Sequence, residues 1–338
     1  MGALRVLSCK DVAACLDLRE VIDTVASVYR QKADGKAQSW PMVYHAFEPG
    51  VADMDIKSGV LGKDEVFGHK TVAWFSQNTQ RGLPDLYGII VVLSALTGEP
   101  LGVVDGASIT GLRTGAAGAL GAKALAKPGA RELLMVGAGH QAPYQIAATL
   151  MLLDSIEVVR VANPHNKERA ADLVKRLPEL LRDQFGLTNQ NVRFEVALDM
   201  AEAVGSADVV ITATMATTPL IEDAWVKPGT HFSCMGADMP GKQEIDPAII
   251  ARARLFTDDT ANCLANGEIE LGVSAGCFGP DHVVGELGAV LTGSVEGRLS
   301  PNDLTVFDSA GTALLDIACA KIALERAAER GLGTVAEF

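Results

Sequence analysis

The sequence predicts an α/β protein that combines a Rossmann-type parallel-sheet domain with a smaller α+β domain. From about residue 130 onward, apolar segments of strand length alternate with helical segments, which is typical of a parallel sheet with crossover helices. Before about residue 108, β-rich segments are separated by turn signals, which favours antiparallel strands. The 338 residues, 48% of them hydrophobic, are enough for two domains with sizeable cores.

The N-terminal elements begin with a predicted helix over residues 18–32. Segments rich in β-forming residues follow at 40–47, 68–75 and 86–93, and the turn sequences GLPD and LTGEP lie between or after them. From Thr110 the chain becomes rich in small residues and Leu, which predicts a closely packed helix that ends at Lys127-Pro128-Gly129.

The later elements alternate as a parallel sheet requires. Strands are predicted in ELLMVGAG, IEVVRVANP, ADVVITAT, THFSCMGA and ARLFTDD, with helices up to about Leu153 and from Lys167. A final helix over residues 313–330 follows this unit, and we expect it to pack back on the N-terminal domain.

The segment from Gly137 to Ala142, GAGHQA, follows a buried-strand pattern and opens a helix. This is the G-x-G-x-x-A form of the dinucleotide fingerprint in its strand–turn–helix setting. The first glycine permits a tight turn, Gly139 lets a pyrophosphate approach the backbone, and free N–H groups at the helix start bind the phosphates. We therefore predict cofactor contacts from Gly137, Gly139, His140 and Gln141.

The next strand ends at Asn163, about twenty residues after the fingerprint, where the ribose-reading side chain belongs. An acidic residue there favours NAD, and a nearby arginine favours NADP. The sequence supplies neither cleanly, although His165 and Lys167 could meet a phosphate; NAD(H) is slightly preferred and NADP(H) stays open. Three threonines complete the predicted cofactor contacts, with an ordinary helix-start hydroxyl as the alternative for the first: Thr114, Thr212 and Thr214.

Charge and cysteine content argue against other classes. The net charge of −13 and the pI near 4.9 would repel nucleic acid and anionic membranes, so a small-molecule partner is favoured. No segment reaches the length of a membrane helix and the N-terminal sequence lacks a secretion-signal pattern, so we expect a cytoplasmic protein. The six cysteines lack metal-ligand spacing, so reduced thiols and no metal site are predicted.

Seven ordered blocks resemble the ornithine cyclodeaminase and μ-crystallin family: GHKTVAWFSQN, GLPDLYG, LTGEPLGVVDG, ITGLRTGAA, VGAGHQA, GADMPGKQEID and VFDSAGTALLD. The resemblance extends over nearly the whole chain. The resemblance implies a homodimer whose N-terminal domain carries substrate-binding residues and the dimer interface. We accordingly assign residues 1–115 and 308–338 to a substrate-binding and dimerisation domain, and residues 116–307 to the dinucleotide-binding domain.

The resemblance also implies roles for three residues. Lys70, in GHK, matches a lysine that contacts the substrate carboxylate or the reacting nitrogen; Arg113, in ITGLRT, matches the arginine that clamps the carboxylate; Asp238, in GADMPGK, matches the acidic residue beside the amine. The chemistry agrees, because a guanidinium fork orients a carboxylate and imine reduction needs an acid–base group in reach. A solvated lysine, an ion-paired arginine and a loop-capping aspartate are the structural alternatives.

Two more residues are candidates for the substrate pocket. Many relatives place a second arginine in the strand equivalent to residues 41–46, which here reads PMVYHA, so Tyr44 or His45 stands in its place. This departure leaves the substrate side chain open. Lys57, in DIKSG, is an additional cation that would suit a second carboxylate. The strings NPH and GKQEIDP resemble the iminosuccinate-reductase branch of the family more than the μ-crystallins.

The resulting prediction is an NAD(P)-dependent oxidoreductase that acts on CH–NH or CH–NH2 groups. It would interconvert a small imino acid and the corresponding L-amino acid, with iminosuccinate and aspartate as one such pair. An ornithine or lysine cyclodeaminase, an ammonia-lyase with catalytic NAD, is the first alternative. A non-catalytic, crystallin-like dinucleotide-binding protein is the second, and such a protein need not keep Lys70, Arg113 and Asp238 together.

Overall fold

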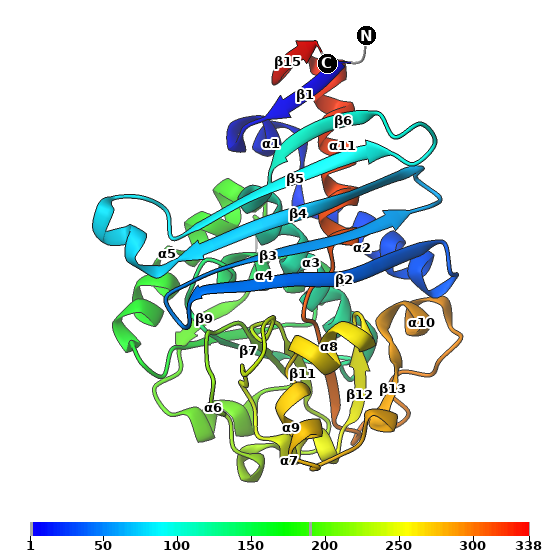
Figure 1. Ribbon diagram of the computed structural model, residues 1–338. Coiled ribbons are helices and arrows are strands. Elements are labelled where there is room, and N and C mark those ends of the chain that lie inside the picture. Colours follow the sequence, from blue (N-terminus) through cyan, green and yellow to red (C-terminus); the bar gives the residue numbers. More distant parts are fainter. Residues whose placement is uncertain (1–2, 189–190, 338) are drawn as a thin grey trace. The chain divides into compact units, whose positions relative to one another are not determined.

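The computed structural model describes residues 3–188 and 191–337. The chain forms two compact units: one runs to Arg113 and resumes at Thr312, and the other spans Thr114–Gly311. The first unit carries a mixed sheet and the second an all-parallel sheet (Figure 1). The predicted α/β class is therefore confirmed, whereas the substrate-binding and dimerisation roles assigned to the domains stay predictions.

The sheet of the first unit is antiparallel except where β1 pairs with β6 in parallel. Its described strands lie in the spatial order β15 (Thr334–Glu337), β1 (Ala3–Leu7), β6 (Pro100–Asp105), β5 (Leu86–Ser94), β4 (Val66–Phe75), β3 (Ala52–Leu61) and β2 (Ala37–Glu48).

Strand β3 has no counterpart among the predicted strands. Its sequence, ADMDIKSGVL, places charged residues at alternate positions, and such residues are rare in strands. Because alternate side chains share one face of a sheet, Asp53, Asp55 and Lys57 all lie on the same face. This face becomes part of the candidate site described below.

Helices cover one face of this sheet. Helix α11 (Ala313–Arg330) packs on β3, β4 and β5 and on α2 (Leu18–Ala33), and Figure 1 shows it running across the strands. Helix α11 approaches β3 so closely that a Cβ added at Gly59 would lie 2.7 Å from Cδ2 of Leu314. The C-terminal helix thus packs on the N-terminal sheet, as the sequence indicated. A shorter helix, α1 (Cys9–Cys15), lies between β1 and α2 in the chain.

Helix α3 (Gly106–Leu125) begins four residues before the predicted start at Thr110. The reason is local: the side chain of Asp105 accepts hydrogen bonds from the backbone N–H of Ser108, at 2.9 Å, and from its hydroxyl. An aspartate in this position caps the free N–H groups of a first helical turn.

The sheet of the second unit is parallel throughout the described residues, so the carboxyl ends of its strands meet at one edge. Its spatial order is β13 (Val283–Glu286), β12 (Arg254–Thr257), β14 (Thr305–Asp308), β11 (His231–Cys234), β10 (Val209–Thr212), β7 (Glu132–Val136), β8 (Val158–Ala162) and β9 (Arg193–Val196).

Crossover helices connect these strands, and apolar strand residues such as Val136, Val210 and Phe232 are buried in the core. Among the described residues, no helix is long and apolar enough to cross a membrane. The helices of this unit are α4 (Ala142–Leu152), α5 (Lys167–Phe185), α6 (Met200–Ser206), α7 (Pro247–Ala251), α8 (Thr260–Asn266), α9 (Glu270–Ser274) and α10 (Leu287–Thr292).

Candidate active site

Three charged side chains meet in the interior of the first unit. Nζ of Lys70, in β4, lies 3.2 Å from Oδ1 of Asp316, in α11. Nε of Arg113, in α3, lies 3.2 Å from the same oxygen. The side chains of Lys70 and Arg113 are only 4% and 8% exposed, and that of Asp316 is fully buried. Two buried cations therefore share one carboxylate oxygen.

Burial changes the chemistry of this lysine. Desolvation and the neighbouring charge of Arg113 lower the pKa of Lys70 to about 8, although the carboxylate of Asp316 acts in the opposite direction. The ammonium group also donates a hydrogen bond to the hydroxyl of Thr110, at 3.3 Å. An amine with a pKa near neutrality can either hold or release a proton during a reaction.

Lys57 and Tyr44 reach the same face of the sheet through strand pairing. Lys57, in β3, is directly opposite Lys70 in the register, and Tyr44, in β2, is directly opposite Asp55. Directly paired residues of antiparallel strands point to one face, so these four side chains share the face on which α11 packs. Lys57 is buried and Tyr44 is partly exposed. The sequence had suggested both as pocket residues, and the register brings them to the side of Lys70.

Asp316 was not among the residues that the sequence singled out. It is separated from Lys70 by 246 positions and from Arg113 by 203 positions. The only signal was its place at the end of VFDSAGTALLD, one of the blocks that carry the family resemblance.

In the second unit, the fingerprint loop follows the carboxyl end of β7. Gly137 has a φ of 111°, and a Cβ added there would lie 2.4 Å from the carbonyl oxygen of Ala213, so a larger residue does not fit. A Cβ added at Gly139 would meet nothing within 4 Å, which leaves the backbone open to a ligand. The loop leads into α4, and Ala142 packs in the core. This geometry fits a bound pyrophosphate.

Two buried polar atoms beside this loop have no hydrogen-bond partner among the described residues. They are the hydroxyl oxygen of Thr114 and Oε1 of Gln141. The backbone of Thr114 is tied to α4, because Nε2 of Gln145 donates to its carbonyl oxygen at 2.9 Å. Both atoms belong to residues predicted to contact the cofactor, and a ligand would supply the missing partners. His140 is exposed, and its ring centroid lies 5.2 Å from that of Tyr144.

The loop after β8 is organised by Asn163. Its Oδ1 accepts hydrogen bonds from the backbone N–H groups of His165, at 3.3 Å, and Asn166, at 3.1 Å. His165 is exposed, and Lys167 donates to the carbonyl of Leu198 at 3.0 Å.

Arg169, which the sequence analysis had not singled out, connects this loop to the fingerprint. Its Nε donates to the carbonyl of Ala138 at 3.0 Å. Its position in the first turn of α5, six residues after Asn163, was the signal that could have drawn attention to it.

Thr212 and Thr214 lie at and just beyond the end of β10. Their hydroxyls donate to Glu244, at 2.6 and 2.8 Å, and Thr212 is fully buried. Both hydroxyls are therefore bound by a residue that the sequence analysis had not identified. Their part in cofactor binding stays a prediction.

Asp238 lies in the loop after β11 and is half exposed. Its Oδ1 is 2.6 Å from Nζ of Lys242, whose side chain is only 7% exposed. Lys242 also donates to the carbonyl of Gly236 at 3.2 Å. The aspartate is thus held next to a buried cation. Lys242 belongs to GADMPGK, so the motif contained this partner as well.

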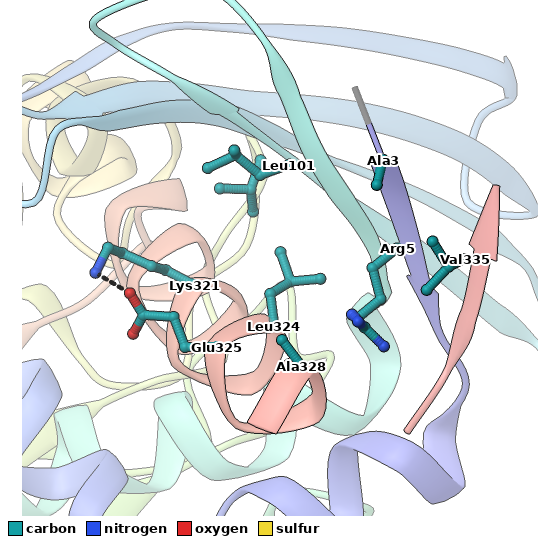
Figure 2. Close-up of a pocket in the computed structure, with 9 residues that line it drawn as sticks. Ala3, Arg5, Leu101, Lys321, Leu324, Glu325, Ala328 and Val335 are labelled. Atoms are coloured by element: carbon teal, nitrogen blue, oxygen red, sulfur yellow. Dashed lines mark hydrogen bonds and ion pairs between the residues drawn. The ribbon is translucent and has the colours of Figure 1, made fainter. Parts of the chain in front are cut away.

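A separate hollow of about 390 Å³ lies in the first unit, between the second half of α11 and strands β1, β5, β6 and β15. Figure 2 shows Lys321 and Glu325, paired at 2.6 Å, on one side of it, and apolar residues such as Leu101 and Leu324 nearby. No residue predicted for the reaction lines this hollow. We assign it no part in catalysis.

A parallel sheet with a glycine loop after β7 and a buried pair of cations beside an aspartate are the features of a dinucleotide-dependent enzyme that handles a small anion. The chain belongs to the ornithine cyclodeaminase/mu-crystallin family, whose model matches residues 4–331. The predicted family and fold are thus confirmed.

Two relatives show what chemistry this family performs. The chain is 33% identical over 336 residues to an alanine dehydrogenase of Archaeoglobus fulgidus, and the match covers 98% of this chain and 98% of the relative. It is also 33% identical over 329 residues to an iminosuccinate reductase of Paracoccus denitrificans, covering 97% of this chain and 98% of the relative. At the level of the family, the predicted oxidoreductase class acting on CH–NH or CH–NH2 groups is confirmed.

Solved structures agree with this placement. An archaeal alanine dehydrogenase dimer with bound NAD superimposes with a TM-score of 0.91 at 32% identity, over 100% of both chains. The pyrroline-2-carboxylate reductase of Thermococcus litoralis, in complex with NADH and L-proline, gives a TM-score of 0.90 at 27% identity, over 98% of this chain and 99% of that one.

Proposed function

We propose that this protein is an NAD-dependent reductase that converts a small imino acid into the corresponding L-amino acid and also catalyses the reverse reaction. The observation that carries the proposal is the buried cluster of Lys70, Arg113 and Asp316. Two cations around one carboxylate leave positive charge in a desolvated position, which suits the carboxylate of an amino or imino acid.

Arg113 and Lys70 are proposed to bind and orient this substrate carboxylate. The guanidinium group offers a planar set of donors, so it fixes the direction of the carboxylate as well as its position. Orientation matters because hydride transfer requires the α-carbon to face the donor closely. When bound, the nicotinamide cofactor supplies or accepts that hydride.

We propose Asp238 and Lys70 as the acid–base groups. Reduction of an imine adds a proton to nitrogen, and oxidation of the amine removes one. Lys70 suits proton transfer because its pKa is lowered to about 8. Asp238 is half exposed and paired with Lys242, so that it can exchange protons with solvent while keeping its orientation.

For the substrate side chain we propose a second carboxylate, as in iminosuccinate. Lys57 is buried and stands directly opposite Lys70, on the same face of the sheet. Lys57 shares this face with Asp53 and Asp55, and a lysine beside Lys70 could bind a second substrate carboxylate. Tyr44 lies on the same face and offers a hydroxyl there.

NAD is the proposed cofactor. Structures of the related alanine dehydrogenase and pyrroline-2-carboxylate reductase hold NAD and NADH, respectively. In this chain, the side chain of Lys167 is bound to the carbonyl of Leu198 and that of Arg169 to the carbonyl of Ala138. Two of the cations close to the ribose position are thus engaged by backbone carbonyls, which lowers the attraction for the additional phosphate of NADP.

We propose that the protein forms a homodimer through the face of the mixed sheet opposite to α11. Strand register aligns Val43, Ile56, Thr71 and Ile89 in one row on this face. Val43 and Ile89 are 56% and 50% exposed. Exposed apolar side chains grouped in a row in this way are unfavourable in water and are typical of an interface. The related archaeal alanine dehydrogenase is a dimer.

The test of the proposed reaction is a spectroscopic assay of NADH consumption. Purified protein is mixed with NADH, and then with NADPH, against imino acids formed from oxaloacetate, pyruvate or cyclic precursors. We expect loss of reduced-nicotinamide absorbance with the dicarboxylic imino acid and NADH. Ammonia release from ornithine or lysine without net change in NAD would instead establish a cyclodeaminase. Cofactor binding without any turnover would establish a non-catalytic protein.

A further inference from the structure

Glu244 is a fully buried carboxylate that binds two segments of the second unit at once. Its oxygens accept hydrogen bonds from the hydroxyl of Thr212 (2.6 Å), from the backbone N–H and the hydroxyl of Thr214 (2.7 and 2.8 Å), and from the backbone N–H of Gly236 (2.9 Å). Thr212 is the last residue of β10 and Thr214 follows that strand, whereas Gly236 follows β11. One side chain therefore joins the ends of two neighbouring strands.

The surroundings of Glu244 fit its carboxylate closely. A Cβ added at Gly236 would lie 2.5 Å from Oε1 of the glutamate, so only glycine permits this close approach. The four donors are neutral groups, and each oxygen receives two of them. A carboxylate that accepts four hydrogen bonds is held in one orientation.

Further buried carboxylates bind the backbone of the segment that carries Glu244. The carboxylate of Glu268 accepts the backbone N–H of Glu244, at 2.8 and 2.9 Å, and that of Ile245, at 2.8 Å. Asp308, at the end of β14, accepts the backbone N–H groups of Glu268 and Ile269, both at 3.2 Å. Three successive carboxylates thus extend from β14 to β10, and all three are fully buried.

The segments held by Glu244 carry residues of the proposed reaction. Asp238 follows Gly236 by two positions, and Lys242 binds both the carboxylate of Asp238 and the carbonyl of Gly236. The glutamate therefore fixes the start of the loop that presents Asp238. On the other segment it fixes Thr214, a predicted cofactor contact.

We propose that Glu244 is a positioning residue, which keeps the loop of Asp238 and the segment of Thr214 at a constant spacing. The inference rests on the proposed function, because it assigns Asp238 to proton transfer and Thr214 to the cofactor. Apolar residues would fill the same volume without the cost of burying a carboxylate. What the carboxylate adds is a fixed geometry, and small displacements at a reacting centre slow hydride transfer strongly.

The test compares Glu244→Gln with the matched control Asp208→Asn. Asp208 is another buried carboxylate of the same unit, but it precedes β10 at the opposite end of that strand, where Lys127 and Lys227 bind it at 2.7 and 3.1 Å. Both substitutions are expected to lower the melting temperature. Both substitutions place an amide NH2 against hydrogen-bond donors, but only Glu244→Gln does so at the segments of Thr214 and Gly236.

For Glu244→Gln we expect kcat to fall by roughly 10- to 100-fold while the Kd for NADH changes by no more than about threefold. NADH deuterated at the transferred position should show a larger isotope effect on kcat, because misalignment makes hydride transfer rate-limiting. Hydrogen exchange at the amides of Thr214 and Gly236 should accelerate, with or without cofactor. Asp208→Asn should leave the isotope effect and these two amides unchanged.

A kcat, an isotope effect and amide protection equal to those of the wild type in folded Glu244→Gln would overturn the proposal. If that variant does not fold, Thr212→Val decides, since it removes one of the four donors with little change of shape; wild-type values in this variant would have the same meaning. If the wild-type protein itself turns over no imino acid, the proposed function fails, and the exchange rates of Thr214 and Gly236 still decide whether Glu244 positions the loops.

Discussion

Asp316 shows how strongly the candidate site depends on one carboxylate. Its Oδ1 binds both Lys70 and Arg113, and its Oδ2 is buried without a hydrogen-bond partner among the described residues. Without this charge, two buried cations would face each other. The aspartate therefore stabilises both cations in their buried positions.

Asp316→Asn is expected to move the pH profile. In the wild-type protein the carboxylate raises the pKa of Lys70 against the larger effects of burial and Arg113. Its removal lowers the pKa of Lys70 further below about 8. If a step needs the protonated amine, the pH at which activity falls on the basic side should therefore move down by about one unit. The measurement is kcat/KM for imino acid reduction as a function of pH.

The matched control for that substitution is Asp34→Asn. Asp34 also pairs with a lysine, Lys36, but at 3.3 Å on an exposed surface. Exposed pairs of this kind contribute little, so the control should leave both activity and pH profile unchanged. A basic limb at the same pH in Asp316→Asn and the wild type would contradict the assignment of that limb to Lys70.

Acid should destabilise the protein partly through Asp208. Burial would raise the pKa of this carboxyl, but hydrogen bonds from Lys127 and the Arg131 backbone, among others, outweigh it and lower the pKa to about 2. A carboxylate with a lowered folded pKa stabilises the fold above its unfolded value of 3.8, and this contribution disappears as the pH falls through about 2. Urea unfolding at about pH 6, above this range, and at about pH 3, within it, measures part of this loss.

In Asp208→Asn the same comparison should show a smaller loss of unfolding free energy on acidification, by on the order of 1 kcal/mol. The change at pH 6 includes the lost ion pairs as well, so the difference between the two pH values is the informative quantity. Identical pH dependence in the two proteins would mean that other carboxylates account for acid unfolding.

Among the elements, the β7–α4 turn gives the sharpest prediction. Gly137→Ala should weaken NADH binding by roughly tenfold or more, because the added methyl group would lie 2.4 Å from the carbonyl of Ala213 and displace the loop. Fluorescence titration of NADH measures the effect. Gly129→Ala is the control: Gly129 also has a positive φ, 71°, but an added Cβ would meet nothing within 4 Å. Equal affinities in the two variants would contradict the proposed pyrophosphate site.

Elements with a strong repeat could be predicted, and those shaped by a functional site could not. Five of the parallel strands and the fingerprint turn were predicted, because they combine apolar runs with glycines whose conformation the sequence indicates, as at Gly137. The parallel strands β9, β13 and β14 were not predicted. Strand β3 was missed because Asp53, Asp55 and Lys57 interrupt its apolar pattern. These charged residues are tolerated because they share a face with Lys70. The charge of Arg113 also acts on this site.

At the scale of the whole molecule, long-range pairing limited what the sequence could predict. The family blocks identified Lys70, Arg113 and Asp238, yet their partners Asp316 and Lys242 came only with the structure. Glu244 was missed for the same reason: its two threonine donors are 30 and 32 positions away on the N-terminal side. A carboxylate in a loop has no periodicity, so its partners are defined only by the fold.

The proposed homodimer can be tested through Val43. Val43→Asp places a charge in the exposed apolar row of β2, where association would bury it without a partner. Light scattering should show a shift toward monomer of at least about tenfold in the dissociation constant. Leu96→Asp is the control, because Leu96 is 70% exposed in the turn after β5 and lies outside that row. An unchanged mass in the first variant would contradict the proposed interface.

The position of α11 in the chain also determines when the cation cluster can form during synthesis. Residues 114–311 leave the ribosome before α11 does, so the second unit can fold while the mixed sheet still lacks the helix that packs on it. Lys70 and Arg113 are synthesised early, whereas Asp316, which pairs with both, is translated more than 200 positions later. A nascent chain would thus complete its second unit first and the charge balance of the Lys70, Arg113 and Asp316 cluster last.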